Sequence, residues 1–207
     1  KKSLTLAVLV SANASSYAAV LPGQLIISEV MANPSAVSDT NGEWFELYNP
    51  TAATLDLNGV SFYDGGSNSH TITESLLIQA GAYLVMGRNS DSSINGGLAV
   101  DYVYSNFTLG NSSDDIFVES MGVQVTALSY NGEGIFGQAG ISAEWLGSGY
   151  GLTPAMLAYG AGDSGTPGSQ GSYDIPTASA VPIPAAGWFM ASGLCSLLIG
   201  KNRRKLK

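Results

Sequence analysis

Oxygen-bearing side chains alternate in the stretch Asp39-Thr40-Asn41-Gly42-Glu43. Carboxylate and amide oxygens are the ligands that calcium prefers, and a glycine lets a loop turn sharply around an ion. Asp39, Asn41 and Glu43 are therefore the candidate metal ligands, and Ca2+ is the one cofactor that the sequence suggests. The stretch lacks the length of an EF-hand loop and its distal bidentate Glu. The alternative is a turn whose polar side chains bond their own backbone.

Hydrolytic chemistry has little support in the sequence. A Ser-His-Asp triad would need His70, the only histidine, as its general base. No Gly-x-Ser-x-Gly or His-Glu-x-x-His motif is present. The polar run before His70 predicts an exposed turn histidine instead.

A pair of carboxylates could serve a glycosidase, and Glu43 and Glu46 are the nearest candidates. Residues three apart in a strand point to opposite faces, so these two side chains cannot flank one bond. We expect Glu43 to be a strand-edge residue, and we predict no catalytic residue and no enzyme.

The charges are strongly segregated along the chain. All 16 acidic residues lie between Glu29 and Asp174, and Arg88 is the one basic residue in that interval. The other basic residues lie at the two ends of the chain. An anionic domain cannot neutralise phosphates, so we expect no nucleic-acid partner.

Short runs of strand-forming residues separated by Gly-, Asn- and Asp-rich turns fill the middle of the chain, which predicts an all-β sandwich. In the run Glu43–Tyr48, Trp44, Glu46 and Tyr48 should share one face, and Glu43, Phe45 and Leu47 the other. The expected strands are Leu25–Met31, Glu43–Tyr48, Leu55–Tyr63, Ala82–Gly87, Val100–Tyr104, Ile116–Ser120, Gln124–Tyr130 and Ala143–Leu146.

Several of these runs resemble the lamin tail domain of exported bacterial proteins. The matching runs are Ser28–Pro34, Gly42–Pro50, Leu55–Val60, Ala80–Met86 and Gly165-Thr166-Pro167-Gly168. The resemblance covers roughly residues 24 to 172, and it implies an immunoglobulin-like β-sandwich. We place this domain at residues 19–172 and a Gly/Ser-rich linker at residues 173–180.

The N-terminus has the layout of a secretory signal peptide. Two lysines precede the apolar run Leu4–Val10 and the small residues Ser11–Ser16. We assign residues 1–18 to a signal helix and place the cleavage after Ala18.

The C-terminus, residues 181–207, predicts a transmembrane helix with a basic end. Val181–Gly200 has no charged residue, and a helix from about Ala178 would be roughly 34 Å long, enough to cross a bilayer. The basic residues from Lys201 onward predict a cytoplasmic C-terminus.

This tail resembles a PEP-CTERM sorting signal of the Val-Pro-Leu-Pro-Ala type. The motif is Val181-Pro182-Ile183-Pro184-Ala185, and Ile183 departs from the type. The resemblance implies an exosortase, a membrane-embedded protease or transpeptidase, as partner. The alternative is a retained single-pass anchor.

Together these features predict a non-catalytic protein exported to the cell surface or the extracellular matrix. Its partners would be the exosortase and a surface polysaccharide or other envelope proteins. The alternatives are a small secreted hydrolase or hydrolase accessory domain, and a calcium-stabilised adhesion module.

Overall fold

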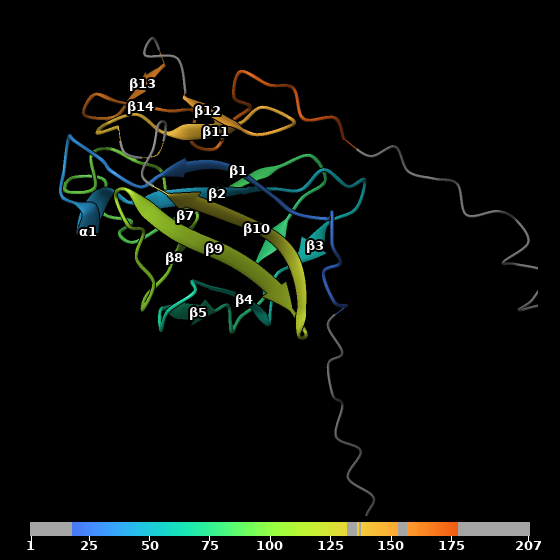
Figure 1. Ribbon diagram of the computed structural model, residues 1–207. Helices are drawn as coiled ribbons and strands as arrows, with labels where there is room; N and C mark the ends of the chain where they lie inside the picture. The colour runs from blue at the N-terminus through green and yellow to red at the C-terminus, as the bar shows by residue number, and fades with distance from the viewer. Residues whose placement is uncertain (1–17, 132–135, 137, 153–156, 178–207) are drawn as a thin grey trace, which may run out of the picture. The chain divides into compact units, whose positions relative to one another are not determined.

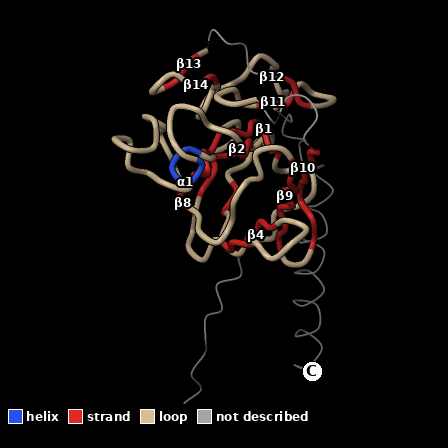
Figure 2. The backbone as a smooth tube through the Cα atoms, turned by 60° about the vertical axis from the view of Figure 1, so that its left-hand side comes forward, coloured by secondary structure: helices blue, strands red, loops and turns tan. Residues whose placement is uncertain are grey.

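A computed structural model of the protein describes residues 18–131, 136, 138–152 and 157–177 (Figure 1). Residues 1–17 of the expected signal peptide, the sorting motif Val181–Ala185 and the apolar tail lie outside the described residues. Within the described ranges, no helix is long and apolar enough to span a bilayer. Strands and loops account for nearly all of these ranges (Figure 2).

Two mainly antiparallel sheets form the body of the fold, and the larger one has six strands in the order β12-β11-β1-β2-β7-β8. Only the β7–β8 pair is parallel among its ladders. Its strands are β1 (Ile26–Met31), β2 (Trp44–Tyr48), β7 (Tyr83–Gly87), β8 (Tyr102–Val103), β11 (Ala143–Trp145) and β12 (Tyr150–Leu152).

The smaller sheet has four strands in the order β10-β9-β4-β5. These are β4 (Val60–Tyr63), β5 (Ser69–Thr71), β9 (Ser113–Ser120) and β10 (Val123–Asn131). The remaining elements are two small pairs and one helical turn: β3 (Leu55–Asp56) with β6 (Leu77–Ile78), β13 (Ala158–Tyr159) with β14 (Asp163–Ser164), and α1 (Asp39–Gly42).

The core between the two sheets is built around the Phe45 ring of β2. Phe45 is fully buried and packs against Phe62, Tyr104 and Phe107, with ring centroids 5.1, 5.7 and 6.2 Å away. Edge-to-face contacts of this kind stabilise a core beyond the area that they bury. Phe45 therefore links the central strand of the larger sheet to the smaller one.

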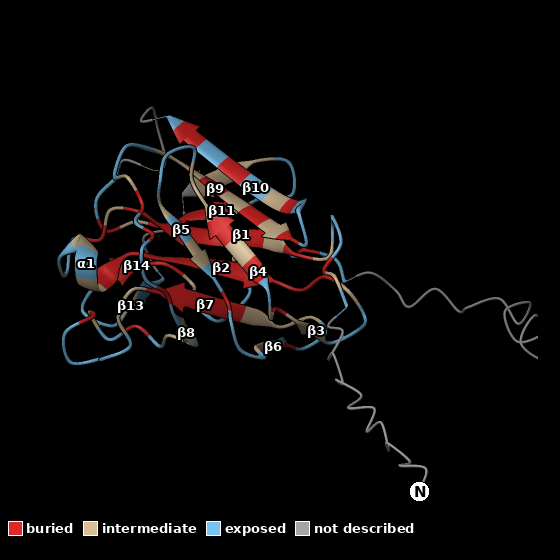
Figure 3. Ribbon diagram, turned by 90° about the horizontal axis from the view of Figure 1, so that it is seen from below, coloured by how far each residue is buried: buried red, intermediate tan, exposed pale blue. Residues whose placement is uncertain are grey.

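All five residues of β2 are buried, so this strand is covered on both faces (Figure 3). Phe45 and Leu47 lie in the main core cluster, whereas Trp44 belongs to a separate cluster with Met31, Val85 and Leu98. The predicted alternation of β2 is thus confirmed. The second face needs a cover of its own, and the C-terminal segment supplies it.

Strand assignment from the sequence was wrong in two places. The run Leu55–Tyr63 is broken into β3 and β4 by a turn at Gly59, where φ is +82° and Val60 N donates to Leu57 O at 2.9 Å. Glycine adopts this left-handed conformation without steric cost. The short strands β5, β6, β12, β13 and β14 were not predicted, because runs of two or three residues carry no readable alternation.

We expect Phe45→Ala to lower the free energy of unfolding by about 3–5 kcal/mol, because it empties the centre of the aromatic cluster. Urea unfolding monitored by circular dichroism measures this change. Phe117→Ala is the matched control, because Phe117 lies half-buried on the outer face of the smaller sheet. Equal losses in the two variants would show that Phe45 is not central to the core.

Candidate functional site

A β-bulge in β1 places two polar side chains on the same face of the larger sheet. The pairing of β1 with β2 shifts register between Ile27 and Glu29, and Ser28 is the extra residue. Ile27 and Val30 both face the main core. Ser28 and Glu29 therefore project together to the opposite face, where Ser28 Oγ lies 2.7 Å from Glu46 Oε1.

Three glutamates form a row across this face. Glu29 of β1 is the register partner of both Glu46 in β2 and Glu144 in β11. Their exposed fractions are 1%, 1% and 2%. Carboxylates directly opposite one another in a sheet repel, and burial removes the water that would solvate them. Such a row requires hydrogen-bond donors from the protein itself.

The donors come from residues 157–177, which we call the strap. Thr166 N donates to Glu29 Oε1 at 2.9 Å, Gly168 N to Glu46 Oε2 at 2.6 Å and Ser172 N to Glu144 Oε2 at 2.7 Å. Hydroxyl groups complete the set, since Ser142 and Thr166 donate to Glu29 and Ser172 donates to Glu144. Each glutamate of the row thus accepts one backbone amide of the strap.

Further contacts hold the strap at both ends. Asp163 accepts the backbone amides of Ser35 and Ala36, with the shortest N–O distance at 3.0 Å. Trp44 Nε1 donates to Tyr159 Oη at 2.8 Å, and Tyr48 Oη donates to the Ile175 carbonyl at 3.2 Å. The strap is therefore fixed along its length as the outer layer of the larger sheet.

Burial raises the pKa of Glu46 from its ordinary 4.5 to about 8, and the nearby Glu29 charge adds to this effect. The hydrogen bonds from Ser28 and Gly168 act in the opposite direction. The geometry accommodates a protonated Glu46, because Ser28 Oγ is also 3.3 Å from the Glu46 carbonyl oxygen. The Ser28 hydroxyl can donate to the backbone carbonyl of Glu46 while it accepts a hydrogen bond from the protonated carboxyl group of Glu46.

The family model of the Lamin Tail Domain matches residues 20–132, more than half of the chain. The chain belongs to the lamin tail domain family. The predicted resemblance is confirmed over the matched residues, whereas Glu144 and the strap lie beyond them. A comparison with curated proteins found no match.

The candidate calcium ligands of this lamin tail domain have other partners. Asp39 Oδ2 accepts from Asn111 Nδ2 at 3.1 Å, and Asn41 Oδ1 accepts from Asn89 Nδ2 at 3.0 Å. No group of three or more His, Cys, Asp or Glu side chains arranged to hold a metal occurs among the described residues. The calcium site at Asp39, Asn41 and Glu43 stays a prediction.

Glu43 stands directly before β2, at the edge of the strand as expected, and it is buried there. It is 2% exposed, and its Oε2 pairs with Arg88 Nη1 at 3.1 Å and accepts the Leu109 amide at 3.2 Å. Burial raises the pKa of Glu43 from 4.5 to about 7, against the opposing effects of Leu109 and Arg88. Glu43 lies among core residues and Glu46 beneath the strap, so the two carboxylates act on opposite faces of the sheet.

The prediction of an exposed turn histidine was wrong. His70 lies in β5 as the register partner of Phe62, and its ring packs on the Phe62 ring at 5.1 Å. Its Nε2 is 2.8 Å from Tyr102 Oη, and burial lowers the pKa of His70. The described hydrogen-bond partners of its ring are Tyr102 and the Ser105 backbone, so its contacts are those of a packing residue.

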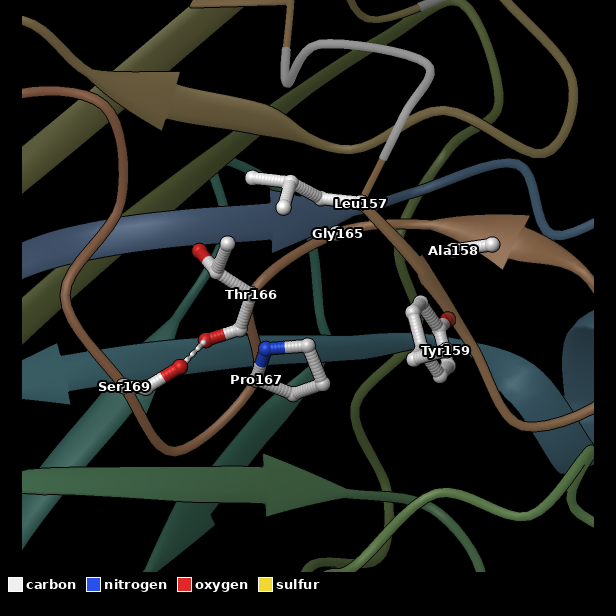
Figure 4. A pocket seen from close by; sticks show the side chains of 7 residues that line it. All are labelled: Leu157, Ala158, Tyr159, Gly165, Thr166, Pro167 and Ser169. Carbon is white, nitrogen blue, oxygen red and sulfur yellow. Dashed lines mark hydrogen bonds between the residues drawn. The ribbon is translucent and has the colours of Figure 1, made fainter.

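A pocket of about 250 Å³ lies on the strap between Leu157–Tyr159 and Gly165–Ser169 (Figure 4). Two of its polar side chains already donate hydrogen bonds within the protein: Thr166 Oγ1 donates to Glu29, and Ser169 Oγ donates to the Thr166 carbonyl. The pocket lining offers no carboxylate, histidine or cysteine to a substrate.

The raised pKa of Glu46 predicts a pH-dependent stability. The folded protein holds a proton that the unfolded chain releases between pH 4.5 and about 8, so stability falls as pH rises through this range. One such group contributes at most about 1.4 kcal/mol per pH unit, and Glu43 acts in the same direction up to about pH 7. Glu46→Gln should make the dependence less steep, because the amide keeps the Ser28 and Gly168 contacts without a titrating proton.

Urea unfolding at half-unit steps from pH 4.5 to 8.5 measures this effect. Glu74→Gln is the control, because Glu74 is an exposed glutamate outside the row. An unchanged slope in Glu46→Gln would mean that Glu46 stays ionised beneath the strap throughout this range.

Proposed function

We propose that the protein is a non-catalytic module that is exported and acts by binding at the cell surface or in the extracellular matrix. The observation that carries this proposal is the charge segregation: Arg88 is the one lysine or arginine between Glu29 and Asp174, and the others lie at the two ends. Retention of basic ends on the cytoplasmic side of a membrane favours passage of the acidic part between them.

The fold is compatible with processing at both ends. Ala18 is exposed, and Val20 is the first residue of the main core, so a cut after Ala18 would spare the core. At the other end, the compact unit that contains the sandwich extends to Thr177, before the motif Val181–Ala185. An exosortase-type enzyme could therefore cut at the motif while the C-terminus is still cytoplasmic, and it would leave the sandwich intact.

The use of the buried acids supports a binding or structural role over a hydrolase. Glu29, Glu46 and Glu144 bind the strap, and Glu43 binds Arg88. All four carboxylates are at most 2% exposed, so a substrate cannot reach them in this structure. The partners that we propose, a surface polysaccharide or other envelope proteins, would bind to the exterior of the sandwich.

Mass spectrometry of the mature protein from its native host tests the proposal. We expect an N-terminus at Ala19, a C-terminus at or near Val181–Ala185 and recovery from the envelope or extracellular fraction. Pro182→Ala should leave the tail uncut, because it changes the sorting motif. Pro176→Ala should be processed like the natural protein, because Pro176 lies outside the motif. A cytoplasmic chain intact from Lys1 to Lys207 would contradict the proposal.

A further inference from the structure

The outer face of the smaller sheet carries a pair of aromatic rings on its two interior strands. Strands β4 and β9 alternate between buried and half-buried residues, so Tyr63 and Phe117 point away from the core. These two residues are register partners, and their ring centroids lie 5.4 Å apart at an interplanar angle of 38°. Neither ring belongs to the core clusters or to the side chains that pack on them. The pair therefore forms an apolar surface outside the core.

Small side chains stand on both sides of this pair. Ala127 on β10 is the register partner of Phe117, and Ser69 on β5 is the register partner of Tyr63. Both are exposed, as are the other outward residues of β5 and of the regular part of β10. The strap lies over the larger sheet, on the opposite side of the fold. The described part of the chain therefore leaves the pair accessible.

Two carboxylates flank the rings along β9. Asp115 and Glu119 share the outward face with Phe117, because each lies two residues away from it in the strand. Glu119 Oε2 accepts from Tyr63 Oη at 3.3 Å, and no described residue donates to the Asp115 carboxylate. Four strand residues span about 13 Å, so a ligand that reaches both carboxylates is longer than one sugar ring.

The charge of this face favours a cationic ligand. Asp115 and Glu119 offer only acceptors, and the other polar side chains on the outward face of the four strands are hydroxyls and amides. Arg88, the one lysine or arginine among the described residues, pairs with Glu43 beside the larger sheet. An anionic ligand would be repelled here, whereas an ammonium group gains from the carboxylates and from the ring faces.

The pairing of the strands excludes one kind of cationic ligand. β9 pairs with β4 and with β10, and β4 also pairs with β5, so the backbone groups beneath the rings are already bonded. A basic peptide cannot add there as a strand, and recognition depends on side chains alone. A sugar ring presents an apolar C–H surface that can stack on an aromatic ring, and its rim carries hydroxyl donors for the flanking acceptors.

We propose that Tyr63, Asp115, Phe117 and Glu119, which we call the platform, bind a polysaccharide that carries free amino groups. Its sugar rings stack on Tyr63 and Phe117, and its ammonium and hydroxyl groups donate to Asp115 and Glu119. This inference rests on the proposed binding role and names the class of polysaccharide, but it does not depend on export or processing.

Calorimetric titration of the full chain with a glucosamine hexamer, at about pH 5.5, tests the proposal. Two comparison ligands separate its parts: the N-acetylglucosamine hexamer has the same backbone without charge, and hexalysine with capped ends has the charge without sugar rings. We expect each to bind at least tenfold more weakly than the glucosamine hexamer. Equal binding of either comparison ligand, or no binding of the glucosamine hexamer, would overturn the proposal.

The rings are tested by Phe117→Ala, which should weaken binding of the glucosamine hexamer at least tenfold because it removes a stacking surface. Phe117→Tyr keeps a ring and should stay within about threefold of the natural protein. Tyr173→Ala is the matched control, because Tyr173 is an aromatic residue of the strap, 38% exposed and outside the platform. Equal losses in Phe117→Ala and Tyr173→Ala would contradict binding at the platform.

The carboxylates are tested by Asp115→Asn, which should weaken the glucosamine hexamer by about fivefold and leave the acetylated hexamer unchanged, since only the charged sugar gains from the lost charge. Asp174→Asn is the control, because Asp174 is an exposed aspartate of the strap. The same loss in both variants would show a general effect of net charge and overturn the proposal. The ends of the mature protein, found by mass spectrometry, test export separately.

Discussion

The structure depends on the hydrogen bonds between the strap and the three buried glutamates. Glu29, Glu46 and Glu144 lie side by side on one face of the larger sheet, and each accepts a backbone amide from the strap. Removal of these amides would take a hydrogen-bond donor from each buried carboxylate and leave Ser142 and Ser28 as the described donors to Glu29 and Glu46, which is costly for buried acids. The strap and the central strands are therefore mutually dependent.

The two faces of the larger sheet are covered in different ways. The inner face is filled mainly by the aromatic and aliphatic Phe45 cluster, and Glu43, the acid on this side, accepts donors from Arg88 and Leu109. The outer face carries polar groups, so its cover must place donors at fixed positions. Gly171 shows how close this fit is, since a Cβ there would lie 2.1 Å from Glu144 Oε2. A side chain at this point would displace the Glu144 carboxylate from its contacts with Ser172.

The sequence was sufficient to predict what depends on local pattern. The alternation in Glu43–Tyr48 predicted both faces of β2, and the runs shared with the lamin tail domain predicted the family. The glutamate row could not be predicted, because it depends on the bulge at Ser28 and on pairing between strands more than a hundred residues apart. His70 was wrongly predicted to lie in an exposed turn, because its place depends on the pairing of β5 with β4, which brings it beside Phe62. A strand of three residues among polar residues shows too little alternation to be recognised in the sequence.

The position of the strap at the end of the domain sequence governs the order in which the fold can form. Strands β1 and β2 leave the ribosome, and any export channel, more than a hundred residues before Thr166 and Gly168. Until those amides arrive, the outer face of the larger sheet presents repelling carboxylates to water, and docking the strap closes the longest loop in the domain. Long-range closure of this kind is slow and late. The β-sandwich can therefore be completed only when the C-terminal strap docks, after nearly the whole domain has been synthesised.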